Sequence, residues 1–266
     1  MTFKTLFASL SVGLACFAAA APVHADALAD VKKAGVLRIA VPQDFPPFGS
    51  VDANLELRGL DIDVARLLAK GLGVKAELIP VSSANRIPYL QTRKADVIIS
   101  TLGKNPEREK VIAFSQPYSP FNNGLFGPPG AKITGPADLA DQTVGVARGT
   151  FEDTLLTDSV PKSTNMRRFE DNNTLISAYL SGQVKIIGTG DFVAASIGEK
   201  DPSNKPALKY VIQESRCLVG LNRDEPALMA KVNEVLTAAK KSGELNAIIV
   251  KWLNVPLPQK LALQLE

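Results

Sequence analysis

Short apolar runs alternate with amphipathic segments from Gly35 onward, a pattern typical of strand–helix–strand units in an α/β protein. The apolar runs of the first series predict strands over 36–41, 74–81 and 96–101. Apolar residues at helical spacing predict a helix that is capped by Asp61, and a second helix is predicted over 85–93. Pro106 is placed in the first turn of a third helix. These elements form one α/β lobe.

A cluster of turn residues separates this series from a second one. Asn122-Asn123-Gly124 and Gly127-Pro128-Pro129-Gly130 favour a boundary or crossover there. The second series predicts extended segments over 143–147, 185–189 and 208–221, and helices after Thr150, over 171–180 and after Asp191. Two helices then close the chain, one over 243–252 and, before it, one whose apolar face is Leu228, Val232, Val235, Leu236 and Ala239. The pattern therefore predicts two α/β lobes.

The first 25 residues differ from the rest of the chain. Lys4 precedes an apolar run over 6–21, and Val23-His24-Ala25 supplies the small residues that a signal peptidase recognises. The run is shorter than the roughly 20 residues that a membrane-spanning helix needs. A lipid anchor on Cys16 is disfavoured, because the preceding leucine stands one place too late for the usual pattern. We expect a secretory signal cleaved after Ala25 and a soluble, periplasmic mature protein.

Composition and charge exclude several classes of function. The net charge of +3, from 30 Lys and Arg against 27 Asp and Glu, is too small and too evenly spread for a nucleic-acid surface. Loss of residues 1–25 removes Cys16 and the only histidine, His24, which excludes His-dependent nucleophiles, His-ligated zinc and an internal disulfide at Cys217. No phosphate-binding glycine motif occurs in the sequence. We expect no metal and no cofactor, and either binding or acid–base chemistry by carboxylates.

Local patterns along the mature chain resemble one family, the periplasmic solute-binding proteins of polar amino-acid ABC transporters. In the first half these are Asp44-Phe45-Pro46-Pro47-Phe48, Gly59-Leu60-Asp61-Ile62-Asp63, Arg86-Ile87-Pro88-Tyr89-Leu90-Gln91, Ala95-Asp96-Val97-Ile98-Ile99, Glu107-Arg108 and Ala113-Phe114-Ser115-Gln116-Pro117-Tyr118. In the second half they are Ala137-Asp138-Leu139, Val144-Gly145-Val146, Gly149-Thr150 and Lys251-Trp252-Leu253. Their shared order and spacing, more than any one pattern, support the resemblance.

The resemblance implies a type II periplasmic binding protein fold, in which two lobes close on a ligand by hinge motion. The first lobe is then discontinuous, because it is built from both ends of the chain. We expect lobe 1 over 26–122 and 218–266 and lobe 2 over 123–217. The two hinge strands should cross near 121–125 and 215–220.

A free amino acid needs a fixed cation for its carboxylate, and the resemblance assigns this role to Arg108 on the first lobe. A guanidinium suits the task because its planar fork gives two parallel hydrogen bonds. Thr101 and Gly103 follow a predicted strand, where α/β folds place ligands, and are expected to contact the same ligand. An exposed arginine on a helix and an ordinary strand-to-helix turn are the structural alternatives.

The second lobe is expected to supply the remaining contacts. Gly149 and Thr150 open a predicted helix, whose free N–H groups attract an anion. Asp191 matches the family's aspartate that accepts the ligand ammonium, although a helix N-cap is also open to it. This segment departs from the family pattern, because Lys185-Ile186 replaces the usual acidic-small pair before the strand.

Side-chain specificity is indicated by a few residues of the first lobe. Phe45 is expected to pack on the ligand and Phe48 to lie in the core. Arg86 matches the arginine that, in glutamate/aspartate binders, reaches an acidic side chain, and an exposed helix position is its alternative. Pro42 occupies the place where binders of basic amino acids often have an acid, while Asp44 keeps such ligands open. Polar or acidic amino acids are favoured.

Three functions remain open at this point. The first is capture of an L-amino acid by a monomer that delivers it to an inner-membrane ABC permease. The second is catalytic, because the same fold includes cyclohexadienyl dehydratases, which act on prephenate or arogenate. Their reaction can use a carboxylic acid with a raised pKa as general acid and needs neither histidine nor metal. The third is ligand-dependent docking to a chemoreceptor or sensor kinase. Binding without catalysis is the prediction, because the sequence identifies no acid in a dry pocket.

Overall fold

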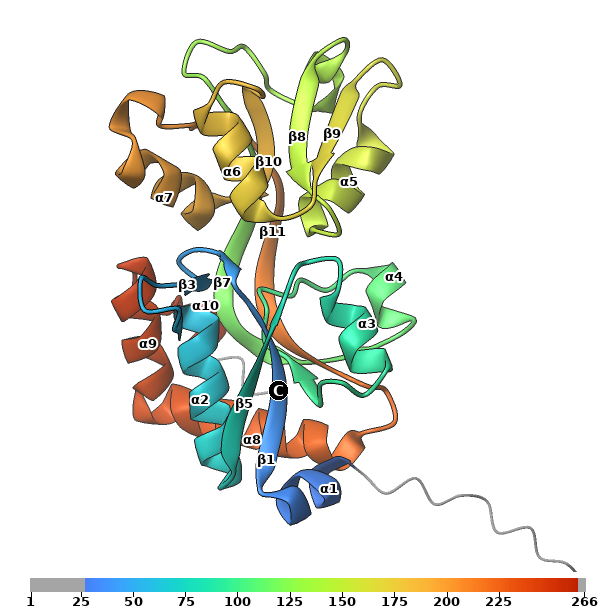
Figure 1. The fold of residues 1–266 in the computed structure, drawn as a ribbon, viewed down its shortest axis with the longest axis vertical. Helices are drawn as coiled ribbons and strands as arrows, with labels where there is room; N and C mark the ends of the chain where they lie inside the picture. Colours follow the sequence, from blue (N-terminus) through green and yellow to red (C-terminus); the bar gives the residue numbers. More distant parts are fainter. Residues whose placement is uncertain (1–26, 263–266) are drawn as a thin grey trace, which may run out of the picture.

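The computed structural model describes residues 27–262, which form two α/β bodies placed one above the other in Figure 1. Two long strands, β7 (Ala113–Gly127) and β11 (Ala207–Leu221), run from one body into the other. The predicted signal over 1–25 lies outside the described residues. Within 27–262, no helix combines the length and the apolar composition needed to cross a bilayer.

One mixed sheet passes through both bodies. Its other strands are β1 (Val36–Pro42), β5 (Lys75–Val81), β6 (Val97–Ile98), β8 (Thr143–Ala147), β9 (Asn165–Phe169) and β10 (Ile186–Gly190). The order is β5-β1-β6-β11-β7-β10-β8-β9, with parallel pairing at both ends and antiparallel pairing around β7 and β11. A small second sheet contains β2 (Asp44–Phe45), β3 (Gly49–Val51) and β4 (Leu57–Arg58).

Helices cover the sheet in both bodies (Figure 1). The lower body in this view holds α1 (Ala27–Ala34), α2 (Leu60–Leu72), α3 (Arg86–Gln91), α4 (Pro106–Glu109), α8 (Pro226–Ser242), α9 (Glu244–Leu253) and α10 (Gln259–Ala262). The upper body holds α5 (Phe151–Ser159), α6 (Asn172–Leu180) and α7 (Asp191–Lys200), with short 3-10 turns over Pro136–Leu139 and Pro202–Asn204. The lower body thus combines the N-terminal and C-terminal parts of the described chain.

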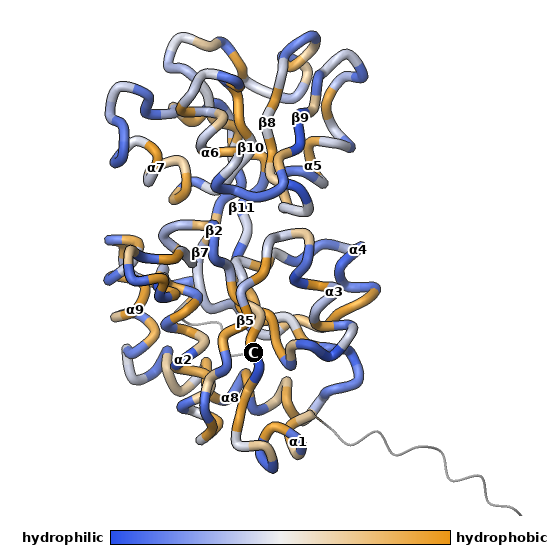
Figure 2. The backbone as a smooth tube through the Cα atoms, viewed as in Figure 1, coloured by the Kyte–Doolittle hydropathy of each residue, from blue (hydrophilic) through white to orange (hydrophobic). Residues whose placement is uncertain are grey.

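The amphipathic pattern of α2 explains the packing of the lower body. Its apolar residues Ile62, Ala65, Leu68 and Leu72 are fully buried. Gly71 lets α2 approach α8 closely, because a Cβ at this position would lie 2.4 Å from a methyl carbon of Val235. Figure 2 shows hydrophobic segments in each of the two bodies.

Two sequence predictions about local structure were wrong. Asp61 does not cap α2, which begins at Leu60 after Gly59; the aspartate is instead fully buried within the first turn. The strand predicted over 96–101 is paired only over Val97–Ile98, because Thr101 adopts a left-handed conformation with φ of +46°. Both differences concern the same contact, since Asp61 accepts hydrogen bonds from Thr101.

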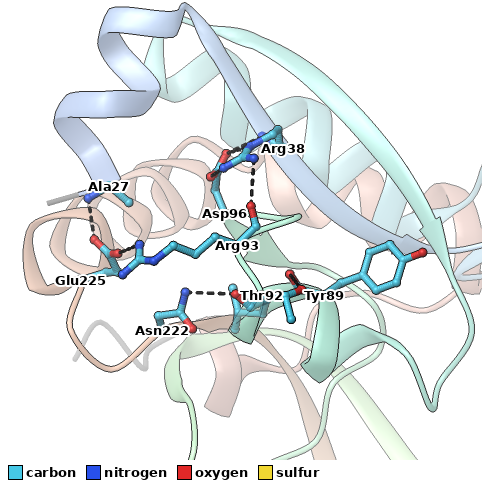
Figure 3. Close-up of polar contacts among 9 residues, drawn as sticks. Ala27, Arg38, Tyr89, Thr92, Arg93, Asp96, Asn222 and Glu225 are labelled. Atoms are coloured by element: carbon cyan, nitrogen blue, oxygen red, sulfur yellow. Dashed lines mark hydrogen bonds and ion pairs between the residues drawn. The ribbon is translucent and has the colours of Figure 1, made fainter. Parts of the chain in front are cut away.

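Polar contacts connect α1 and the residue before α8 to the sheet of the lower body, as Figure 3 shows. The buried carboxylate of Glu225 accepts hydrogen bonds from the backbone N of Ala27 and from Arg93 Nη1. Arg38 on β1 in turn pairs with Asp96 and donates to the carbonyl of Arg93. The start of α8 is therefore connected to α1 and, through Arg93, to β1.

A similar contact joins α2 to α9. The only tryptophan of the chain, Trp252, donates from Nε1 to Oδ2 of Asp63 at 2.7 Å. The guanidinium of Arg58 lies 5.5 Å from the centre of the indole ring. These three residues all belong to the lower body.

Candidate functional site

A cavity lies between the two bodies, at the carboxyl ends of parallel strands. Its lining comes from the lower body, from both long strands and from the start of α5: Pro42, Phe45, Ser83, Arg86, Ser100, Thr101, Gly103, Phe121, Asn123, Thr150, Phe151, Glu152 and Ser215. Five of the residues expected from the sequence line it, namely Phe45, Arg86, Thr101, Gly103 and Thr150. Such a position agrees with the general placement of ligands in α/β folds.

Two buried guanidiniums meet in this cleft. Arg86 donates from Nη1 to the carbonyl of Ser100 at 2.5 Å, and Arg108 from Nη1 to that of Gly103 at 2.8 Å. Their Nη2 atoms reach across the cleft to the same oxygen, the carbonyl of Gly149, at 3.4 and 3.3 Å. No carboxylate of residues 27–262 lies within the 4.0 Å ion-pair distance of either guanidinium. The site therefore holds two positive charges that the described chain leaves unpaired.

Burial governs the electrostatics of these arginines. It lowers the pKa of Arg86. Burial and, after it, the charge of Arg86 lower the pKa of Arg108 to about 9. Both side chains are more than nine-tenths buried, and arginine keeps its proton in proteins. A bound anion would relieve the repulsion between them, so the pair is suited to hold a negatively charged group.

The floor of the cavity depends on Asp61. Oδ2 of Asp61 accepts hydrogen bonds from the backbone N and Oγ1 of Thr101, at 2.7 and 2.8 Å, and Oδ1 accepts one from Tyr118 at 2.8 Å. These bonds hold Thr101 in its left-handed conformation. Burial, opposed by the hydrogen bonds, raises the pKa of Asp61 to about 6. Asp61 is thus a positioning residue beneath the cavity.

The opposite wall is formed by the start of α5. Thr150 is the N-cap of this helix, and its Oγ1 accepts a hydrogen bond from the backbone N of Asp153 at 3.2 Å. Gly149 has a φ of +73°, and a Cβ there would lie 2.8 Å from the Cα of Ala84 in the lower body. Only glycine allows this close approach of the two bodies. Gly149 and Arg108 thus lie beside the cavity, joined by the hydrogen bond described above.

Sequence reasoning missed several polar residues of the cavity, among them Glu152 and Asn123. Both are buried, with exposed fractions of 2% and 1%. Burial raises the pKa of Glu152. Oε1 of Glu152 and Oδ1 of Asn123 have no hydrogen-bond partner among the described residues, and the same is true of Arg86 Nε. The position of Glu152 in the first turn after Gly149-Thr150 was the available signal.

Asp191 lies at the first position of α7 and is not among the residues that line the cavity. Its Oδ2 accepts a hydrogen bond from Asn122 Nδ2 at 2.9 Å, and its Oδ1 accepts one from the backbone N of Phe192 at 2.8 Å. The preceding Gly190 lies against the ring of Phe121, which a Cβ would approach to 2.3 Å. An aromatic ring therefore occupies the space beside the end of β10.

Aromatic side chains close the other side of the cleft. Phe45 lines the cavity, while Phe48 is fully buried behind it, and their ring centres lie 5.9 Å apart. Phe121 from β7 packs against both rings, at 6.0 and 5.5 Å. These rings give the cleft an apolar wall opposite the charged groups.

A polar contact also joins the two bodies outside the cavity. Oδ2 of Asp44 accepts hydrogen bonds from the backbone N and Nδ2 of Asn172, at 2.8 and 3.0 Å. Burial raises the pKa of Asp44. The carboxylate is therefore bonded to the upper body and does not line the cavity.

Comparisons with known proteins agree with this geometry. Residues 37–255 match the family model described as bacterial extracellular solute-binding proteins, family 3. The glutamate/aspartate import solute-binding protein of Escherichia coli K12 is 27% identical over 268 residues, which cover 95% of this chain and 87% of that protein.

Solved structures give the same result. The amino acid ABC transporter substrate-binding protein AbpA of Streptococcus pneumoniae, bound to L-arginine, is 31% identical with a TM-score of 0.76, covering 84% of this chain and 96% of that one. A solute receptor for L-cysteine of Neisseria gonorrhoeae is 31% identical with a TM-score of 0.79, covering 86% and 94%. The two-lobed type II fold expected from the sequence is confirmed by these neighbours.

Proposed function

Because this chain belongs to family 3 of the bacterial extracellular solute-binding proteins, we propose that it captures an L-amino acid in the cleft and delivers it to an inner-membrane ABC permease. Solute-binding proteins of ABC transporters are binding proteins and not enzymes, and the chain is one of them. We further propose that it acts as a monomer in the periplasm, after cleavage at Ala25. Lobe 1 then comprises 26–122 and 218–266, and lobe 2 comprises 123–217.

The pair of buried, unpaired guanidiniums is the observation that supports an acidic ligand within this class. Arg108 supplies the cation for the α-carboxylate, with Gly103, Thr101 and Thr150 around it. Arg86 lies in the same cavity and requires a second anion, since no carboxylate of residues 27–262 pairs with it. Two carboxylates on one ligand satisfy both cations.

The relatives do not share one ligand, because their names include arginine, cysteine and glutamate/aspartate. A basic side chain would meet Arg86 and would find Asp44 already bonded to Asn172. A neutral side chain would leave Arg86 without a counter-charge. Charge complementarity therefore favours glutamate or aspartate over the other two classes.

A thermal-shift panel on unfolded and refolded protein, freed of carried-over ligand, tests this function. The panel contains each common amino acid, dicarboxylates, opines, polyamines and prephenate. A ligand at about a thousand times its Kd stabilises the folded state by roughly 4 kcal/mol, which raises Tm by about 10 °C. We expect this shift with L-glutamate or L-aspartate. A response to prephenate with none to amino acids would instead support the dehydratase function.

A pair of arginine variants then tests the acidic specificity by titration calorimetry. Arg86→Ala should weaken L-glutamate far more than L-glutamine, because only glutamate loses a charge partner. Arg148 directly precedes Gly149, is exposed and does not line the cavity. Arg148→Ala therefore removes an equal charge outside the cavity and serves as the control. Equal weakening of both ligands by Arg86→Ala would contradict the assignment of the second anion to Arg86.

A further inference from the structure

Three buried polar atoms of residues that line the cavity have no partner in the described part of the chain. They are Nε of Arg86, Oε1 of Glu152 and Oδ1 of Asn123. Buried polar groups are nearly always hydrogen-bonded, and an unsatisfied one destabilises the folded protein. Because all three belong to one cavity, a single bound molecule can satisfy them. The donor or acceptor character of each atom therefore indicates which polar groups that molecule carries.

One of the three atoms is a donor and two are acceptors. Nε of Arg86 needs an acceptor, whereas Glu152 and Asn123 both need an N–H or O–H group. The amide orientation of Asn123 is fixed by β11, because its Nδ2 donates to the carbonyl of Gln213 at 3.3 Å. Exchange of N and O would place two acceptors against each other, so the oxygen is the amide atom that is left without a partner.

Glu152 interacts with both arginines through space without pairing with either. Its negative charge favours the charged forms of Arg86 and Arg108, yet it lies beyond the 4.0 Å ion-pair distance from both. Glu152 also packs against β10, since a Cβ at Gly188 would lie 3.2 Å from the Cβ of Glu152. The residue thus lies between β10 and the cavity that it lines.

We propose that Glu152 and Asn123 form the acceptor pair that binds the ammonium group of the ligand, the role that the sequence pattern assigns to Asp191. This inference rests on the proposed function and specifies its site. An ammonium offers three N–H donors and a positive charge, which match two unpaired acceptor oxygens, one of them on a carboxylate. With Arg86 and Arg108, the cavity then presents two cations and one anion, the complement of an acidic amino acid.

The surroundings of Asp191 support the assignment of the ammonium group to Glu152 and Asn123 in place of Asp191. Both of its oxygens already accept hydrogen bonds, from Asn122 and from the backbone of Phe192. Asn122 and Asn123 are neighbours in β7, so their side chains project to opposite faces of the sheet. Asn123 lines the cavity and Asn122 does not, which places the Asp191 contact on the other face.

Pairs of ligands with and without the ammonium group test the proposal. The pairs are L-glutamate with glutarate, L-aspartate with succinate, and L-glutamine with 4-carbamoylbutyrate. Calorimetry measures the affinity of each ligand for the wild type and for the variants Glu152→Gln, Asp191→Asn and Asp158→Asn. Asp158 is an exposed carboxylate of the same helix as Glu152 and is the matched control. Circular dichroism and Tm establish that each variant is folded.

We expect Glu152→Gln to weaken the amino acids by roughly 30-fold or more, because a buried charge pair is lost. Binding of the ligands without the ammonium group should stay within about threefold or become tighter, since a repulsive carboxylate is removed. Equal losses for both members of a pair would indicate a structural role and overturn the proposal.

The competing assignment has its own signature. An ammonium-selective loss in Asp191→Asn, with none in Glu152→Gln, would overturn the proposal and assign the group to Asp191. If Glu152→Gln does not fold, Asn123→Leu provides the second variant, and it should show the same selective loss. Wild-type protein that binds none of the amino acids in the wider panel refutes the proposed function itself, which is a distinct result.

Discussion

Asn172 at the start of α6 donates two hydrogen bonds to one oxygen of Asp44, and these bonds connect the two lobes directly. The contact exists only while the lobes are close together, because Asp44 belongs to the small sheet beside β1 and Asn172 to lobe 2. It therefore stabilises the closed arrangement relative to an open one. Ligand affinity depends on this equilibrium, since only the closed form surrounds the ligand.

Asn172→Ala should weaken ligand binding by roughly threefold to thirtyfold, because it removes a hydrogen bond to a charged group. The radius of gyration of the ligand-free protein, measured by small-angle scattering, should rise as the open form gains population. Asn173→Ala is the control, because the neighbouring asparagine is exposed. An unchanged affinity in Asn172→Ala would show that the contact does not influence closure.

Gly149→Ala should block closure through a steric clash. The added Cβ would lie 2.8 Å from the Cα of Ala84 on the other lobe, and the φ of +73° already disfavours alanine. We expect the affinity to fall about tenfold or more in calorimetry. Gly182→Ala separates the two causes, because Gly182 has a φ of +76° and open space around it. That variant should lose some stability and retain its affinity.

Arg108→Ala should abolish amino-acid binding while the fold remains intact. The ligand carboxylate would lose its cation inside a cleft that excludes water, which corresponds to a loss of about 2–5 kcal/mol or more. Arg148→Ala changes the net charge equally at an exposed position and should bind normally. A Kd for Arg108→Ala within a few-fold of wild type would disprove the assigned role of Arg108.

Asp61 should make stability depend on pH in an identifiable direction. Its pKa of about 6 in the folded protein lies above the ordinary value of 3.8, so the folded state retains the proton more strongly than the unfolded state. The resulting stabilisation is complete below pH 4 and is lost as the pH rises through 6, by about 3 kcal/mol in all. Urea unfolding from pH 4 to pH 7, followed by circular dichroism, measures it.

Asp61→Asn provides the comparison for this pH profile, because an amide has no proton to lose in this range. The variant should be less stable at low pH, and the difference from wild type should shrink as the pH rises. Asp30→Asn, an exposed carboxylate in α1, should parallel the wild-type profile. Parallel profiles for Asp61→Asn and wild type would show that Asp61 does not titrate as described.

Glu225→Gln should destabilise the protein without changing ligand affinity. Glu225 is 2% exposed and accepts hydrogen bonds from Ala27 and from Arg93, whose own side chain is 41% exposed (Figure 3). Loss of the charge on this buried carboxylate should lower Tm by several degrees in calorimetry, because its hydrogen-bond donors lose a charged acceptor. Glu234→Gln removes an exposed ion pair with Lys231 on the same helix and should change Tm by about 1 °C or less.

Much of the fold could be predicted from periodicity alone. Helix α2 forms where apolar residues recur at helical spacing. The strands β1, β5 and β8 form where the sequence has short apolar runs, and in β8 residues 144–147 are all buried. The continuous sheet order was not available from pattern, since the pairing of β7 with β11 joins residues about a hundred positions apart. Only the family resemblance predicted that the first lobe is built from both ends of the chain.

The candidate site was predictable only in part from the local sequence. Arg86, Thr101 and Thr150 stand at element boundaries, where local patterns are informative. Glu152 and Asn123 have no distinctive local pattern, because their importance comes from burial beside residues of other elements. Asp61 was assigned a capping role that its local position allows, whereas its true partners are Thr101 and Tyr118. Long-range contacts, rather than residue type, decide these roles.

The location of Trp252 has a practical consequence for optical assays. Its contacts with Asp63 and Arg58 stay within lobe 1, so hinge closure leaves the surroundings of the indole unchanged. Intrinsic tryptophan emission should therefore follow denaturation and remain silent during ligand capture. An engineered fluorescent reporter of binding in this protein needs a label near the hinge strands or on lobe 2, with the native tryptophan serving as an internal reference.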